Sequence, residues 1–97
     1  MITFRFKDYG EYLGTRQLGE RARKKLLPLI KENEKVCLDF DGVDVVSNTF
    51  ADECIAKLLL EMPLNELKLH TTFNGLNDFA RKNIALAPSV GQTDFLL

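Results

Sequence analysis

Residues 39–60, DFDGVDVVSNTFADECIAKLLL, constrain the fold most, because a strand pattern passes into a helix pattern within this stretch. The strand expected just before Asp41 is followed by three valines that lead to a short polar corner. That corner is Ser47-Asn48-Thr49, and these residue types are the ones preferred at helix starts. From Phe50 onward, apolar residues recur at helical spacing. We therefore expect a strand-to-helix corner here, and we expect any functional site of the chain at this corner.

The rest of the sequence continues the same alternation of period-two and period-3.6 patterns. Thr15 has the position and chemistry of a helix N-cap, and Pro28 is expected to kink the helix that follows it. Strand 35–40 carries apolar residues in both phases, which predicts an interior strand covered on both faces. The pattern predicts strands at residues 2–6, 11–13, 35–40 and 66–70, helices at residues 16–32, 50–61 and 74–83, and a loosely held tail from about residue 86.

This order predicts an α/β domain with a small, mostly parallel (mixed) sheet of about four strands and about three helices. A chain of 97 residues is a single domain of ordinary small size, and 45% apolar residues suffice for one core. In parallel sheets, functional loops gather at the carboxyl ends of the strands. The polar corner follows such an end.

The composition excludes several classes of function. The formal net charge of −1 gives no sign of a nucleic-acid partner or an anionic membrane surface. No apolar run approaches the roughly 18 residues of a membrane span, and the N-terminus is too short and polar for a signal peptide. Cys37 and Cys54 fall on apolar phases, which indicates buried thiols rather than a disulfide. We therefore expect a cytoplasmic protein, bacterial in style.

The charges are unevenly distributed along the chain. The first helix has a basic run that contains a single acid, Glu20, and residues 33–66 carry eight acids against two lysines. Two solvated faces are the simpler interpretation, and a polar docking surface is the alternative.

At the corner itself, three interpretations of Ser47, Asn48 and Thr49 are open. The first is simple helix capping, with Thr49 and Asp52 at the spacing of a weak capping box. The second is a receptor for a phosphate or carboxylate at the helix N-terminus. The third is a hydroxyl that becomes phosphorylated. Asp52 and Glu53 are expected in the first turn, on the solvent face, where acids complement the helix dipole.

Other reactive residues form no recognisable constellation. Asp39, Asp41 and Asp44 could hold Mg²⁺ if they converged, but solvation of a turn and a strand end explains them better. His70 could act as a base, and Cys54 as a nucleophile, although no local motif supports either. We expect no cofactor, no metal and no catalytic residue.

The quoted stretch VCLDFDGVDVVSNTFADECIAKLL resembles the STAS-like domains of unknown function. In that family a strand ends in a D-F-x-G-V pattern, and a corner bearing Ser or Thr opens the next helix with F-A-D/E. The segments LGTRQLGERARKKL and LKLHTTFNGLNDFARKNI are similar to the family's first-helix entry and third-strand region. The resemblance covers about residues 13–84, and its central motif is more specific than its flanks.

The resemblance implies a fold like that of the anti-sigma-factor antagonists, whose D-S-S-G corner carries a phosphorylated serine. Here Ser47 stands where the antagonists have Asp, Asn48 lies near their phosphorylated serine, and Phe50 replaces the glycine. A modified residue would therefore be Ser47 or Thr49. The implied partner is a protein, a histidine-kinase-like ATPase of the anti-sigma kinase type.

We therefore expect a non-enzymatic regulatory interaction module with docking candidates Ser47, Asn48, Thr49, Asp52 and Glu53. The alternative is a small-ligand, anion or nucleotide binder that uses the same helix N-terminus. A third possibility is a hydrolase or transferase built on Cys54 or His70. The sequence leaves the oligomeric state open.

Overall fold

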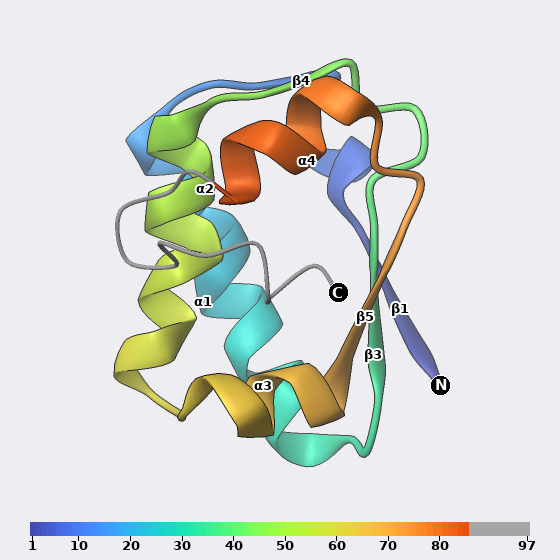
Figure 1. Ribbon diagram of the computed structural model, residues 1–97, viewed down its shortest axis with the longest axis vertical. Coiled ribbons are helices and arrows are strands. Elements are labelled where there is room, and N and C mark those ends of the chain that lie inside the picture. The colour runs from blue at the N-terminus through green and yellow to red at the C-terminus, as the bar shows by residue number, and fades with distance from the viewer. Residues whose placement is uncertain (86–97) are drawn as a thin grey trace.

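The computed structural model describes residues 1–85 and contains the expected alternation of strands and helices (Figure 1). Helix α1 has the bounds that the sequence predicts, with Thr15 as its N-cap, and it continues through Pro28. In chain order the elements are β1 (Ile2–Arg5), the 3-10 helix η1 (Phe6–Tyr9), β2 (Tyr12–Leu13), α1 (Arg16–Glu32), β3 (Val36–Asp39), β4 (Val45–Val46), α2 (Asn48–Cys54), the 3-10 helix η2 (Ala56–Leu60), α3 (Leu64–His70), β5 (Thr71–Asn74) and α4 (Asp78–Ala85).

The strands form two small sheets, and every pairing in the described residues is parallel. The larger sheet has the order β1-β3-β5, so β3 lies between two neighbours and β1 lies at an edge. The smaller sheet pairs β2 with β4, with Leu13 opposite Val46. The α/β class is thus confirmed. Within residues 1–85, the expected sheet of about four strands is in fact two sheets with five strands, and four α-helices replace the expected three.

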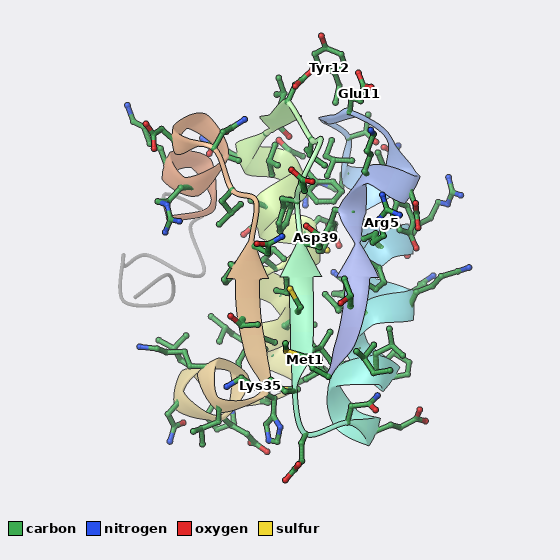
Figure 2. The ribbon with its side chains drawn as sticks, turned by 90° about the vertical axis from the view of Figure 1, so that its right-hand side faces the viewer. Met1, Arg5, Glu11, Tyr12, Lys35 and Asp39 are labelled. Carbon is green, nitrogen blue, oxygen red and sulfur yellow. The ribbon has the colours of Figure 1, made fainter. Side chains whose placement is uncertain are left out.

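The helices of the described residues cover only one face of the three-stranded sheet. Figure 2 looks onto the other face, and the helices of the described chain lie behind the strands in that view. Phe4 and Leu38 point into the core, whereas Arg5 is exposed and Asp39 is half-buried. The prediction that strand 35–40 is covered on both faces is therefore wrong. Cys37 lies on the uncovered face and is only half-buried. A small thiol is tolerated on such a partly solvated face.

Aromatic side chains fill the core at the carboxyl ends of β1 and β3. The rings of Phe6 and Phe40 stack with centroids 4.1 Å apart, and Phe50 meets Phe6 edge to face at 6.2 Å. Phe50 is fully buried. The ring of Phe50 therefore anchors the first turn of α2 in the core, because a large buried aromatic side chain contributes much apolar contact.

Three predicted element bounds need correction. Residues 66–70 form most of helix α3 rather than a strand, and the strand follows at Thr71–Asn74. Helix 50–61 is instead the short α2 followed by the 3-10 helix η2. The helix expected from residue 74 begins at Asp78, because Asn74 still belongs to β5 and Gly75 takes a positive φ of 74°.

Gly75 occupies a turn that only glycine fits. A Cβ there would lie 2.5 Å from the backbone nitrogen of Asp41. The turn after β5 therefore packs directly on the turn after β3, at the carboxyl end of the sheet.

The tail predicted from about residue 86 lies outside the described residues, and the single-domain assignment stays a prediction. Within residues 1–85, the buried apolar side chains form one connected cluster. No helix in this part of the chain has the length and apolar character to cross a membrane.

Candidate functional site: the paired helix starts

Ser47 fixes the corner through hydrogen bonds on both sides. Its Oγ accepts the backbone N–H of Phe50 at 3.0 Å, which makes Ser47 the N-cap of α2. The same hydroxyl donates to the carbonyl oxygen of Gly14 at 3.1 Å, and the Ser47 N–H donates to the carbonyl of Leu13 at 2.9 Å. The corner is therefore tied to the segment that leads into α1.

These contacts bring the starts of two helices side by side. Thr15 caps α1 by accepting the N–H of Leu18 at 3.1 Å, and it directly follows Gly14. Figure 1 shows α1 and α2 running next to each other from the end of the molecule where the strands finish. The predicted location of the corner, at the carboxyl end of a parallel strand, is confirmed.

Asn48 and Thr49 form the exposed part of the corner. The Thr49 hydroxyl has no hydrogen-bond partner among residues 1–85, whereas the Ser47 hydroxyl has two. The capping box expected from Thr49 and Asp52 does not form, because α2 begins two residues earlier than Phe50 and Ser47 takes the cap. Asp52 and Glu53 consequently lie beyond the first turn of α2.

The sequence interpretation placed Glu53 on the solvent face, and this is wrong. Glu53 is only 4% exposed, at the contact between α1 and α2. Its Oε1 lies 2.7 Å from Arg16 Nη1 and 2.9 Å from Lys57 Nζ, and its Oε2 lies 2.7 Å from Arg23 Nη1. Arg23 also donates to the backbone carbonyl of Glu53. A buried carboxylate is tolerated here because three cations surround it.

The cation cluster also sets the ionisation of Glu53. Hydrogen bonds from Lys57, and then from Arg23 and Arg16, lower the pKa of the Glu53 carboxyl from 4.5 to about 2, although burial opposes this change. Asp52 is half-buried, and its Oδ2 lies 3.9 Å from Arg16 Nη1. Arg16 thus joins the first turn of α1 to both acids of α2.

Arg16, Arg23 and Lys57 were not predicted as site residues. The sequence favours two solvated faces, one for the basic run of helix 16–32 and one for the acidic centre. In the structure, basic residues of α1 form ion pairs with acidic residues of α2. Two signals were present in the sequence. Arg16 and Arg23 are seven residues apart, and so share a helix face, and Glu53 and Lys57 have the i,i+4 spacing of a helical ion pair. What periodicity could not supply was that the two helices lie side by side.

Gly19 permits the close approach of α1 and α2 on which the cluster depends. A Cβ at Gly19 would lie 3.0 Å from the Cβ of Glu53 and 3.1 Å from the carbonyl oxygen of Phe50. Any larger residue there would push the helices apart, and the arginines of α1 would move with them.

The other candidates occupy ordinary structural roles. The carboxylate of Asp39 accepts the N–H of Asp41 and the amide of Asn74, both at 3.0 Å, which stabilises the turn after β3. Within residues 1–85, no three potential metal ligands gather into one group. Nδ1 of His70 lies 2.9 Å from the carbonyl oxygen of Glu34, at the end of α3. Cys54 is fully buried, and this burial raises the pKa of its thiol.

The anion-receptor interpretation stays a prediction. Of the N–H groups at the start of α2, that of Phe50 is already bonded to Ser47 Oγ, and α2 has only 7 residues.

Comparison with known proteins bears on the whole arrangement. A family model described as a STAS-like domain of unknown function (DUF4325) matches residues 19–78, which is more than half of the chain and includes the corner. Neither the search of curated proteins nor the search of solved structures gave a match. The chain therefore belongs to the family of STAS-like domains of unknown function.

Proposed function

We propose that this protein is a non-enzymatic regulatory interaction module whose corner docks on a protein partner. The docking surface consists of Ser47, Asn48, Thr49 and Asp52, which we call the corner surface. The observation that carries the proposal is that Asn48 and Thr49 are exposed on a corner fixed from both sides by Ser47. A surface fixed before binding loses little conformational entropy when a partner docks.

Phosphorylation is proposed at Thr49 rather than at Ser47. The Ser47 hydroxyl is engaged twice, so a phosphate on it would remove the cap of α2 and the bond to Gly14. Thr49 is exposed and lies three residues before Asp52, which places the two side chains on one face of the helix. A phosphate there would add about two negative charges beside Asp52. It would also compete with Asp52 for the guanidinium of Arg16, whose side chain is 54% exposed.

The proposed partner is a histidine-kinase-like ATPase that both binds the corner surface and modifies it. The transfer moves the γ-phosphoryl group of ATP to the hydroxyl oxygen of Thr49. ADP is the leaving group, and a base of the ATPase takes the hydroxyl proton. The added charge would then weaken docking through repulsion at Asp52. The partner type rests on the family likeness and on the available hydroxyl, and no catalytic residue of this chain is required.

Incubation of the folded protein with such an ATPase and ATP tests this proposal by intact mass. We expect a gain of one phosphate in the wild type and in Asp52→Asn, and no gain in Thr49→Ala. A gain that persists in Thr49→Ala but is lost in Ser47→Ala would move the modified residue to Ser47. No gain, together with unchanged binding to Thr49→Ala and Asn48→Ala, would remove both the switch and the corner surface.

A further inference from the structure

A groove runs along the free edge of β1, away from the corner surface. Its volume is about 840 Å³, and it lies between β1 with η1 on one side and α1 on the other. Phe4, Tyr9 and Leu18 provide its apolar part, and the rings of Phe4 and Tyr9 stack with centroids 5.8 Å apart. Figure 2 shows β1 at the edge of the sheet, next to α1, with no strand of the described chain beyond it.

The backbone of β1 offers unpaired hydrogen-bonding groups to this groove. The N–H of Ile2 donates to the carbonyl oxygen of Lys35, the residue just before β3, so Ile2 and Phe4 direct their backbone groups toward β3. In a parallel ladder, alternate residues direct theirs to the opposite side. The N–H and C=O of Thr3 and the N–H of Arg5 therefore face the free edge, and both residues line the groove. Such an edge is a template for a further strand.

The charge along the groove is strongly positive, although the chain as a whole has a net charge of −1. Arg5, Arg21, Lys24 and Lys25 line it, with Asp8 as the one acid among the lining residues. Lys24 is partly neutralised by Glu20, 2.9 Å away, in a well-exposed pair. Among residues 1–85, Arg5, Arg21 and Lys25 form no salt bridge, so the lining keeps a net positive charge even when Asp8 is counted. A positive charge beside a free strand edge complements an acidic chain in extended conformation.

We propose that this edge groove binds an acidic peptide segment of a partner protein as an added strand beside β1. The segment would exchange backbone hydrogen bonds with Thr3 and Arg5, place apolar side chains against Phe4, Tyr9 and Leu18, and direct its acids to the basic rim. This mode of recognition takes affinity from the backbone bonds and selectivity from the alternating side chains. The groove does not depend on the corner surface, so the two proposals stand or fall separately.

The probe is a capped peptide of about eight residues in which glutamate and valine alternate, long enough to span β1. Its binding is followed by fluorescence anisotropy and by amide hydrogen exchange of the protein. We expect the exchange of the Thr3 and Arg5 amides to slow on binding, while the amides of Ile2 and Phe4 keep their values. The same peptide with every backbone nitrogen methylated keeps its charge and loses its donors, and we expect it to bind about tenfold more weakly or worse.

Two variants test the charge. Arg21→Glu with Lys25→Glu reverses two cations of the rim, and we expect binding to weaken by about tenfold or more. Lys68→Glu changes an exposed lysine on α3, outside the groove, and should leave binding unchanged. Thermal unfolding of each variant checks that the fold is retained.

Several outcomes would overturn the proposal. One is the absence of peptide binding to the wild type. Another is binding that the methylated peptide reproduces, or that leaves the exchange of Thr3 and Arg5 unchanged, because this would be charge attraction without strand addition. A third is equal displacement by inorganic phosphate or by a single-stranded oligonucleotide, which would make the groove a general anion site.

Discussion

Glu53 is the residue on which the relation between the two helix starts depends most. Its carboxylate receives hydrogen bonds from Arg16 and Arg23 on α1 and from Lys57 on η2. These cations sit at the margin of the core, with side-chain exposures from 21% to 54%, while Glu53 itself is almost fully buried. Removing the carboxylate of Glu53 would therefore leave three cations that water can reach. Removing the cations would instead leave a buried, unpaired carboxylate.

We predict that Glu53→Gln lowers the free energy of unfolding by about 3 kcal/mol at neutral pH, near the lower end for breaking a buried ion pair. Denaturant unfolding measures this value. Glu20→Gln is the matched control, because its exposed pair with Lys24 should change stability by less than about 1 kcal/mol. Equal effects in the two variants would show that Glu53 does not join the helices.

The acid stability of the protein should also depend on Glu53. Its pKa is lowered in the folded state, so the folded protein binds fewer protons than the unfolded chain, and stability rises with pH. The contribution of Glu53 is fully present above pH 4.5 and is lost as the pH falls from 4.5 toward about 2. In Glu53→Gln this part of the pH dependence should disappear. An unchanged acid limb would contradict the lowered pKa.

The two hydroxyl residues of the corner should respond differently to replacement by alanine. Ser47→Ala removes the cap of α2 and should lower the free energy of unfolding by about 1 kcal/mol. Thr49→Ala removes an exposed hydroxyl with no partner in the described chain and should change it by less than about 0.5 kcal/mol. Thermal unfolding separates the two. A larger loss in Thr49→Ala would mean that Thr49, and not Ser47, caps the helix.

At the scale of elements, the contact between α1 and α2 depends on Gly19. Gly19→Ala adds a Cβ where two neighbouring atoms lie within 3.1 Å, and one of them is backbone. We predict a net loss of about 1 kcal/mol, because overpacking of about 1–3 kcal/mol exceeds the helix propensity gained by alanine. Gly14→Ala is the control, since a Cβ there meets nothing within 4 Å. A stabilised Gly19→Ala protein would show that the helices separate easily.

The elements also show what the sequence could predict and what it could not. The approximate bounds predicted for helix α1 agree with the structure, because Thr15 gives a cap and Asn33 an end to a long apolar stripe. Residues 66–70 were wrongly predicted as a strand. Leu67 and Leu69 alternate there, but the window is too short to distinguish the strand period from the helix period. Leu64 and Leu67, three residues apart, carried the helix signal. Leu69 is in fact 68% exposed, which a half-buried strand would not explain.

The corner was located correctly because its signals are local: apolar valines, capping residues and a helical stripe. The environment of Glu53 was missed for the opposite reason. A charged residue reads as solvent-facing on its own helix, and only the packing of α1 against α2 makes that position interior. Arg23 lies 30 positions before Glu53, and Arg16 lies 37 positions before it. Ion pairs over such separations leave no periodic signature in a single sequence.

At the scale of the whole molecule, the two cysteines differ in their exposure to solvent. Cys37 lies on the half-solvated face of β3, and Cys54 lies fully buried in α2. We predict that a thiol reagent labels Cys37 in the native protein, and that it labels Cys54 only at the rate of global unfolding. Burial raises the pKa of both thiols, so labelling of either should be slower than that of a free cysteine. Rapid labelling of Cys54 would revive an enzymatic interpretation.

The molecule as a whole presents two separate candidate surfaces, the corner surface at the helix starts and the edge groove along β1. A partner that grips both would gain avidity from their fixed geometry. The corner surface is the central claim, because it unites the family likeness, the capping geometry and the available hydroxyl.

The most direct test of that claim is the binding of a histidine-kinase-like ATPase to the wild type and to Asn48→Arg, measured by calorimetry. We predict that Asn48→Arg, a bulky change at an exposed corner position, weakens binding by about tenfold or more. Lys68→Glu on α3 should not weaken it. Equal affinity for the wild type and Asn48→Arg would contradict the claim that the corner docks.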